Sequence, residues 1–72
     1  MKKVNKIKIR VNGKIIKIQD KISLQILIKK LKIPINKVAI ELNRKIVNKK
    51  SLGNKKVKKN DEIEIVHFIG GG

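Results

Sequence analysis

The sequence predicts a single α+β domain in which one main helix packs on a mixed sheet, with the elements in the order β-β-α-β-β-β. The chain has 72 residues, which is enough for only one hydrophobic core. Several short segments alternate apolar and polar residues, as strands with one solvent-exposed face do. One segment between them has helical spacing instead. The last alternating segment can lie beside the first, which closes the sheet into a roll.

Residues 6–11 and 14–19 are expected to form a β-hairpin. Isoleucine alternates with basic residues in the first segment and largely with lysine in the second. Between them stands Asn12-Gly13, and both residue types tolerate the positive φ angles of a type I′ turn. The two segments should therefore pair as antiparallel strands.

A helix is predicted to begin at Ser23, whose hydroxyl can accept hydrogen bonds from the first free N–H groups of the helix. The apolar stripe that follows has helical spacing and consists of Leu24, Leu27, Ile28 and Leu31. Pro34 disfavours a helical conformation at Ile33. We therefore expect the helix to end near Lys32.

Three further strands are expected after the helix. Residues 38–42 should form the third strand, residues 46–47 a short fourth, and residues 62–68 the last. The segment from residue 48 to residue 60 is rich in Lys, Asn, Ser and Gly, which favours loops and one helical turn. Its apolar anchors are Leu52 and Val57.

The composition limits the classes of function. A formal net charge of +15 raises the question of nucleic-acid binding. However, the basic residues are almost all lysines spread along the chain, and there is no Trp or Tyr on which a base could stack. This argues against specific nucleic-acid binding, although a basic RNA-binding module stays an alternative. The absence of Cys excludes disulfides, thiolate metal sites and a cysteine nucleophile.

A catalytic or metal site is not expected. His67 is the only histidine, so it lacks the partners that a metal site needs. Glu62 and Glu64 share one face of the last strand, opposite Ile63 and Ile65, and this face should be solvated. The chain should therefore have no bound cofactor, and any chemistry would be performed on it by partner enzymes.

Docking of such a partner is expected on the last strand. If Ile63 and Ile65 point towards the helix, Val66 and Phe68 point the other way, and the only aromatic side chain of the protein is then partly exposed. We predict that Val66 and Phe68, continuing into Ile69, form the partner-docking surface.

The chain ends in Gly70-Gly71-Gly72, which no packed element would favour, because each glycine loses much conformational freedom on folding. We interpret residues 1–69 as the folded domain and residues 70–72 as a flexible tail; a frayed end without a function is the alternative. In the functional interpretation, Gly70 and Gly71 thread a narrow enzyme channel and present the α-carboxylate of Gly72. Activation of that carboxylate requires a partner that uses ATP.

Residues 38–43, 46–47 and especially 61–72 resemble the corresponding segments of the thiamine-biosynthesis sulfur carriers, the ThiS family. The resemblance extends to the Asn12-Gly13 turn and the helix start at Ser23. It implies a ubiquitin-like β-grasp fold. It also implies that a ThiF-like enzyme adenylates Gly72, that the carboxylate becomes a thiocarboxylate with sulfur from a donor enzyme, and that a ThiG-like thiazole synthase receives this sulfur.

The sequence departs from this family at a few positions. Asn60 replaces the usual turn glycine, which is acceptable because Asn tolerates a left-handed conformation. Asn48 replaces a common proline, and residues 49–59 match poorly. Carriers for molybdopterin synthesis and for tRNA thiolation share the glycine ending, so these pathways are alternatives.

We expect a cytoplasmic protein, or a protein of the plastid stroma if an organelle encodes it. No stretch approaches the roughly 20 apolar residues that span a membrane, and the N-terminus lacks a secretory signal. The composition is dominated by Lys, Ile and Asn, which have A/T-rich codons, and this fits a reduced bacterial genome or a plastid.

Overall fold

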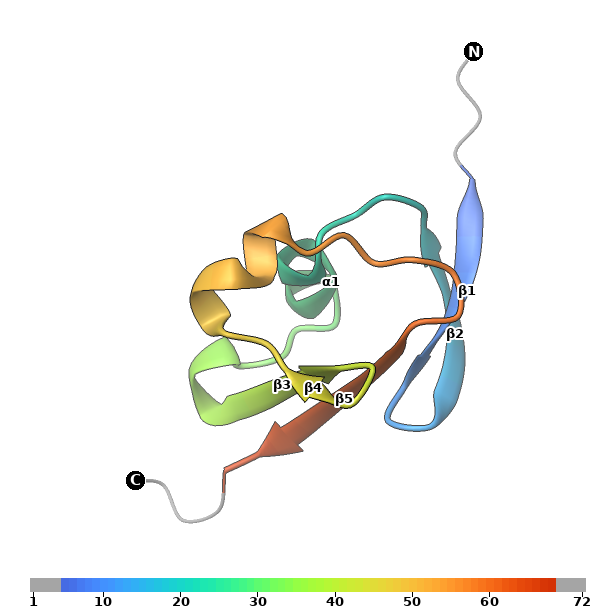
Figure 1. Ribbon diagram of the computed structural model, residues 1–72. Coiled ribbons are helices and arrows are strands. Elements are labelled where there is room, and N and C mark those ends of the chain that lie inside the picture. The colour runs from blue at the N-terminus through green and yellow to red at the C-terminus, as the bar shows by residue number, and fades with distance from the viewer. Residues whose placement is uncertain (1–4, 69–72) are drawn as a thin grey trace.

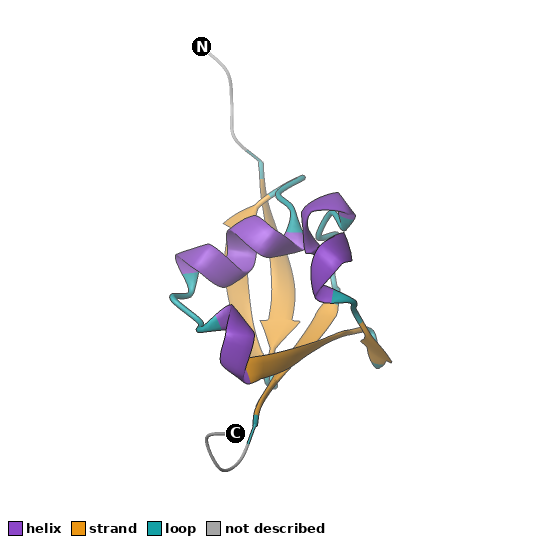
Figure 2. Cartoon of the chain, turned by 90° about the vertical axis from the view of Figure 1, so that its left-hand side faces the viewer, coloured by secondary structure: helices purple, strands orange, loops and turns teal. Residues whose placement is uncertain are grey.

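The computed structural model describes residues 5–68, in which one α-helix and two short 3₁₀-helices pack on a five-stranded sheet (Figure 1). Viewed from the helical side, the helices lie in front of the strands as a separate layer (Figure 2). The α+β class and the main order of elements agree with the prediction from sequence. Within residues 5–68, no helix is long and apolar enough to cross a membrane.

The first two strands, β1 (Lys6–Val11) and β2 (Lys14–Gln19), form the predicted antiparallel hairpin. The turn residues Asn12 and Gly13 have φ angles of 49° and 82°, as a type I′ turn requires. Ile9 and Ile18 are buried under the helix layer, whereas the basic residues of β1 are exposed. The hairpin therefore contributes one apolar and one charged face to the sheet.

Helix α1 (Leu24–Lys30) begins as predicted, with the Ser23 hydroxyl accepting a hydrogen bond from the Ile26 N–H at 3.2 Å. It ends two residues before Lys32, where we expected its end. Lys32 has a left-handed φ of 57°, and the N–H groups of Lys32 and Ile33 bond back to the carbonyls of Lys29 and Ile28. This is a Schellman termination, in which lysine occupies the position that usually holds glycine.

The middle of the chain shows two corrections. A 3₁₀-helix that was not predicted, η1 (Ile35–Lys37), follows Pro34. Strand β3 (Val38–Leu42) has the predicted bounds, but β4 is Lys45–Ile46 instead of residues 46–47. The reason is a second tight turn at Asn43-Arg44, with φ angles of 51° and 71°, which starts the return strand one residue earlier.

The lysine-rich segment folds around its two predicted anchors, Leu52 and Val57, which are 3% and 1% exposed. Its helical turn is η2 (Lys49–Asn54), capped by the Asn48 side chain, which accepts a hydrogen bond from the Lys50 N–H at 2.9 Å. Asn60 has a φ of 69°, so the left-handed conformation expected of it is confirmed.

Strand β5 is Glu62–His67, so Phe68 lies just after the strand instead of within it. The strand order is β2-β1-β5-β3-β4, in which β5 pairs parallel with β1 and antiparallel with β3. The prediction that the last strand lies beside the first is confirmed. The core between sheet and helices is entirely aliphatic, apart from the buried Ser23 hydroxyl.

Candidate functional site: the outer sheet face and the strand before the tail

Four of the residues assigned a function from sequence, Ile69, Gly70, Gly71 and Gly72, lie outside the described residues 5–68. The structure instead shows how the preceding strand is held. β5 occupies the centre of the sheet, with two strands on either side of it. Its inward residues Ile63 and Ile65 are 1% and 8% exposed. Burial of such a side chain contributes roughly 1.5–3 kcal/mol, so this strand is firmly anchored.

Asn12 extends the contact between β1 and β5 beyond the end of β1. The backbone pairing covers only Arg10 with Glu62 and Val11 with Ile63. Beyond it, the Asn12 N–H donates to the Ile63 carbonyl at 2.9 Å, and its side-chain Oδ1 accepts from the Ile65 N–H at 2.7 Å. Asn12, in the hairpin turn, thus makes the hydrogen bonds to β5 that a further residue of β1 would otherwise make.

Asn43 holds β5 from the opposite side. Its N–H donates to the Glu62 carbonyl at 2.7 Å, its Oδ1 accepts from the Glu62 N–H at 2.9 Å, and its Nδ2 donates to the Asp61 carboxylate at 3.1 Å. Neither Asn12 nor Asn43 was expected from the sequence to have such a role. An asparagine at a hairpin turn between two strands is the signal that could have indicated it, since its side chain can mimic a backbone group.

Val66 and Phe68, two of the three residues assigned to docking, are 48% and 60% exposed. The Phe68 N–H donates to the Lys37 carbonyl at 2.9 Å, which fixes its backbone beside η1. The Lys49 Nζ lies 5.4 Å from the centroid of its ring, within range of a cation–π contact. The only aromatic side chain of the protein is therefore outside the core, as expected. A docking role for it stays a prediction.

The sheet side opposite α1, called here the outer face, is defined by the residues that alternate with the buried ones. In β1 and β2 it carries mainly cations, and in β3 and β5 mainly carboxylates and apolar groups. Its members are Lys6, Lys8, Arg10, Ile15, Lys17, Gln19, Ala39, Glu41, Ile46, Glu62, Glu64 and Val66. Glu62 and Glu64 are exposed, as the sequence predicted.

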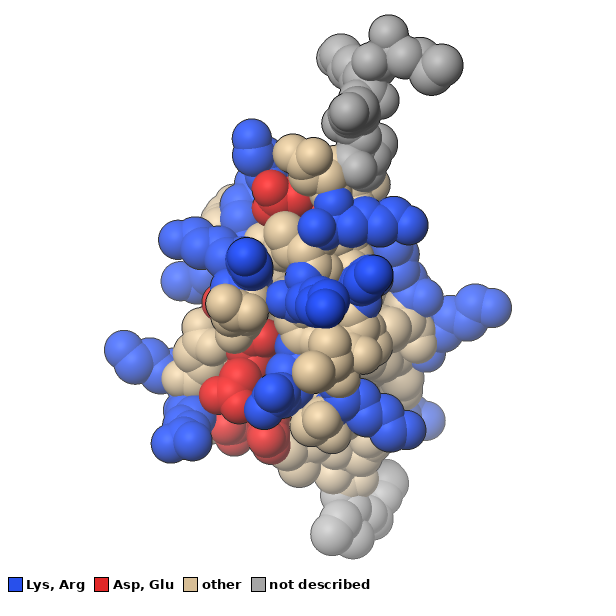
Figure 3. All heavy atoms as spheres, turned by 90° about the vertical axis from the view of Figure 1, so that its right-hand side faces the viewer, with Lys and Arg blue, Asp and Glu red and all other residues tan. Residues whose placement is uncertain are grey.

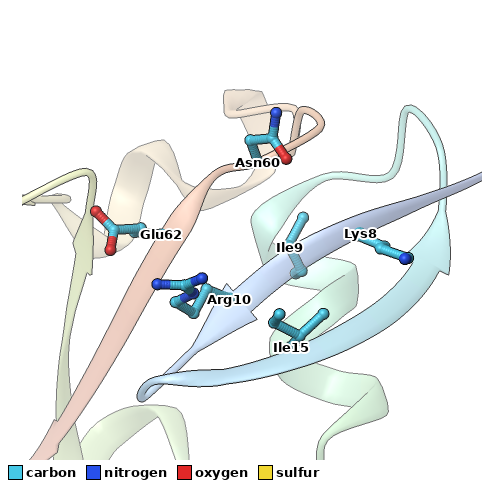
Figure 4. A pocket seen from close by; sticks show the side chains of 6 residues that line it. All are labelled: Lys8, Ile9, Arg10, Ile15, Asn60 and Glu62. Atoms are coloured by element: carbon cyan, nitrogen blue, oxygen red, sulfur yellow. The ribbon is translucent and has the colours of Figure 1, made fainter.

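A hollow of about 350 Å³ lies where β1 and β5 meet on this face. Figure 4 shows the side chain of Arg10 extending from β1 towards β5, which contributes Glu62, while Ile15 comes from β2. A second hollow of about 350 Å³, more apolar, lies at the end of β5 and is lined by Ile16, Leu31, Ile65 and His67 among others. Both are open to the surface.

The titratable groups do not converge on a reaction centre. Within residues 5–68, no group of three or more His, Cys, Asp or Glu side chains could hold a metal ion. His67 is exposed and opposes Val38 across the strand pair. The described residues hold a strand in place and offer a surface beside it.

Comparison with known proteins identifies the fold and the family. A solved structure of the thiamine biosynthesis protein ThiS from Geobacter metallireducens is similar, with a TM-score of 0.82 and 28% identity over 92% of this chain and 100% of that one. This match confirms the β-grasp fold. A thiazole synthase from Magnetococcus marinus is 47% identical over 36 residues, which are 50% of this chain but only 11% of that protein. The model of the ThiS family matches residues 3–72, and the chain therefore belongs to the ThiS family.

Proposed function

We propose that this protein is a sulfur carrier for formation of the thiamine thiazole, with the C-terminal carboxylate of Gly72 as its reactive group. The observation that carries the proposal is the family match, which extends through residue 72 and so includes the glycine ending. The firm anchoring of β5 on both sides supports it, because a tail is presented reproducibly only if its base is fixed.

The chemistry follows from the properties of a carboxylate. A partner enzyme of the ThiF type would bind ATP; a carboxylate oxygen of Gly72 attacks the α-phosphorus, pyrophosphate leaves, and an acyl adenylate forms. A sulfur donor at the oxidation level of sulfide then attacks the carbonyl carbon and expels AMP, which leaves a thiocarboxylate. This chain supplies no catalytic group; it supplies the carboxylate and the surface that positions it.

Delivery of the sulfur to a thiazole synthase of the ThiG type completes the proposal. The local similarity to a protein named thiazole synthase favours this pathway over molybdopterin synthesis or tRNA thiolation. We place partner docking at Val66, Phe68 and Ile69, next to the tail, since Val66 and Phe68 are exposed apolar side chains without a covering layer among the described residues.

Mass spectrometry tests the proposal directly. The protein is incubated with a ThiF-like enzyme, ATP and a sulfur donor. Its intact mass should rise by the difference between sulfur and oxygen, and fragmentation should assign the change to Gly72. A modification elsewhere, or none, would contradict the proposal.

Two length variants sharpen this test. Deletion of Gly72 should reduce turnover sharply, because each residue of extended chain spans roughly 3.3–3.6 Å and the carboxylate would fall short of the reacting phosphate by that distance. Addition of one residue after Gly72 should be equally damaging. Circular dichroism should be unchanged in both. Normal sulfur transfer by the extended variant would exclude the mechanism.

Binding to RNA tests the alternative class. Tight binding to generic RNA that survives moderate salt, together with failure of a ThiF-like enzyme to adenylate the tail, would favour an RNA-binding module instead.

A further inference from the structure

The strand register separates opposite charges on the outer face into two areas. Lys8 lies directly opposite Lys17 in the β1–β2 pair, and Glu41 lies directly opposite Glu64 in the β3–β5 pair. Arg10 and Glu62 oppose each other at the boundary between the two areas. Figure 3, which views the molecule from the side of β1 and β2, shows acidic side chains gathered together among lysines and arginines.

This arrangement costs folding stability. Like charges directly opposite each other on neighbouring strands are destabilising, whereas opposite charges stabilise. The chain contains only five carboxylates among 20 basic residues, and yet three of them, Glu41, Glu62 and Glu64, share one sheet face. Exchange of one lysine with one glutamate would turn both unfavourable pairs into favourable ones. Intramolecular stability therefore does not account for this pattern.

Exposed apolar side chains accompany the charges. Ile15 is 62% exposed, Ile46 is 76% exposed and Val66 is 48% exposed. Ile46 opposes Glu41, and Val66 opposes Ala39, so both lie next to the carboxylates. Large apolar groups beside segregated charges are typical of a surface that a partner protein covers.

We propose that the adenylating enzyme docks on this face with the complementary division of charge: basic side chains against Glu41, Glu62 and Glu64, and acidic side chains against Lys8 and Lys17. This inference rests on the proposed function and names the chemistry of the partner's surface. The face includes β5, the strand that precedes the tail in the sequence. The two charge areas fix the orientation of the enzyme, because a rotated partner would oppose like charges.

Other occupants fit the pattern less well. A phosphate polymer would pair with the cations of β1 and β2 but would be repelled by the carboxylate area. A second copy rotated about an axis along the strands would match the two areas, but each copy carries a net charge of +15, which opposes the approach. A heterologous protein surface satisfies both areas without this repulsion.

Two charge reversals in opposite directions test the proposal. Glu41→Lys changes the net charge from +15 to +17, and Lys17→Glu changes it from +15 to +13. Each converts a like-charge pair into an opposite pair, so each should raise the melting temperature by about 1–4 °C. Each should nevertheless raise the dissociation rate from the adenylating enzyme about fivefold, measured by surface plasmon resonance.

Two matched controls distinguish the effect of a charge on the outer face from the effect of the net charge of the protein. Asp20→Lys makes the same change in net charge as Glu41→Lys, and Lys29→Glu on α1 makes the same change as Lys17→Glu; neither residue belongs to the outer face. The dissociation rates of both controls should equal that of the wild type. If the dissociation rates of all four variants follow net charge, or if the two outer-face variants dissociate like the wild type, the proposal is wrong.

The outcome is distinguishable from failure of the proposed function. Adenylation of the wild type, followed as ATP–pyrophosphate exchange, tests the function alone. Normal exchange with unchanged dissociation of the two variants overturns only the charge-matched docking. If the wild type neither binds the enzyme nor supports exchange, both ideas fall. A wild-type dimer in sedimentation that either outer-face variant abolishes would assign the face to a second copy and also overturn the inference.

Discussion

Asn12 combines two requirements that few residue types meet together. Its φ of 49° suits glycine or asparagine, and its side chain must also reach the Ile65 N–H, at 2.7 Å in the structure. Glycine would satisfy only the first requirement, and most other residues would satisfy neither. This position therefore joins the shape of the first hairpin to the strand that precedes the tail.

Replacement of Asn12 by Gly separates the two roles. Asn12→Gly keeps the turn but leaves the part-buried Ile65 N–H without its acceptor, so the free energy of unfolding should fall by about 1–2 kcal/mol. Urea denaturation measures this loss. Hydrogen exchange of the Ile65 amide should become faster, and an unchanged exchange rate would show that the side chain does not protect it.

Phe68 is predicted to act in docking and not in the core. Phe68→Ser should weaken binding to the adenylating enzyme about tenfold or more, because exposed aromatic residues are often the main contributors to an interface. Its melting temperature should change little. Ile26→Ser is a matched control, since Ile26 is 45% exposed on α1. Unfolding of the Phe68 variant would assign this side chain to the core. Unchanged binding would show that it has no role in docking.

Local sequence signals predicted which helices and strands form better than they predicted where these elements begin and end. The Asn12-Gly13 hairpin, the Ser23 cap and β3 were predicted because the decisive chemistry lies within a few residues. The helix ends at Lys30, two residues before the expected end near Lys32, because Lys32 adopts a left-handed conformation that lysine rarely adopts. The start of β4 was missed because the turn at Asn43-Arg44 lacks the usual glycine.

The candidate site was predictable only in part. Exposure of Val66 and Phe68 follows from strand alternation, which the sequence shows directly. The pairing of Glu41 with Glu64 does not follow from strand alternation, because it depends on the register between strands that are distant in the chain. The same holds for the bonds of Asn43 to Glu62. Long-range register is a property of the folded sheet and leaves no local signal.

The left-handed lysine gives a prediction for the end of α1. Lys32→Gly should stabilise the protein by about 0.5–1 kcal/mol, because glycine adopts a φ of 57° without the strain that a side chain causes there. The relief of this strain should exceed the cost of the greater conformational entropy that glycine has in the unfolded state. Thermal denaturation measures the change. Lys30→Gly, within the helix, should instead destabilise by about 1 kcal/mol. Destabilisation by both changes would show that Lys32 is not strained.

For the whole molecule, the net charge of +15 should govern encounter with a partner more than the lifetime of the complex. All lysines between residues 5 and 68 are exposed, so their long-range field is screened by salt. In stopped-flow experiments, the association rate with an acidic partner should fall as the ionic strength rises from about 0.01 M to about 1 M. The dissociation rate should change much less, because charge pairs within a docked interface are screened less than the long-range field. An association rate that does not depend on salt would contradict this.

The parallel pairing of β1 with β5 also has a kinetic consequence. It connects segments near the two ends of the described chain, and the bond between Asn12 and Ile65 spans 53 residues in sequence. Contacts between such distant segments form late and slowly, because the intervening chain must be ordered first. Glu62, Glu64 and Val66 join the outer face only when β5 has inserted between β1 and β3. A partner that recognises this face therefore selects chains that have finished folding, and a chain with a detached last strand would escape activation.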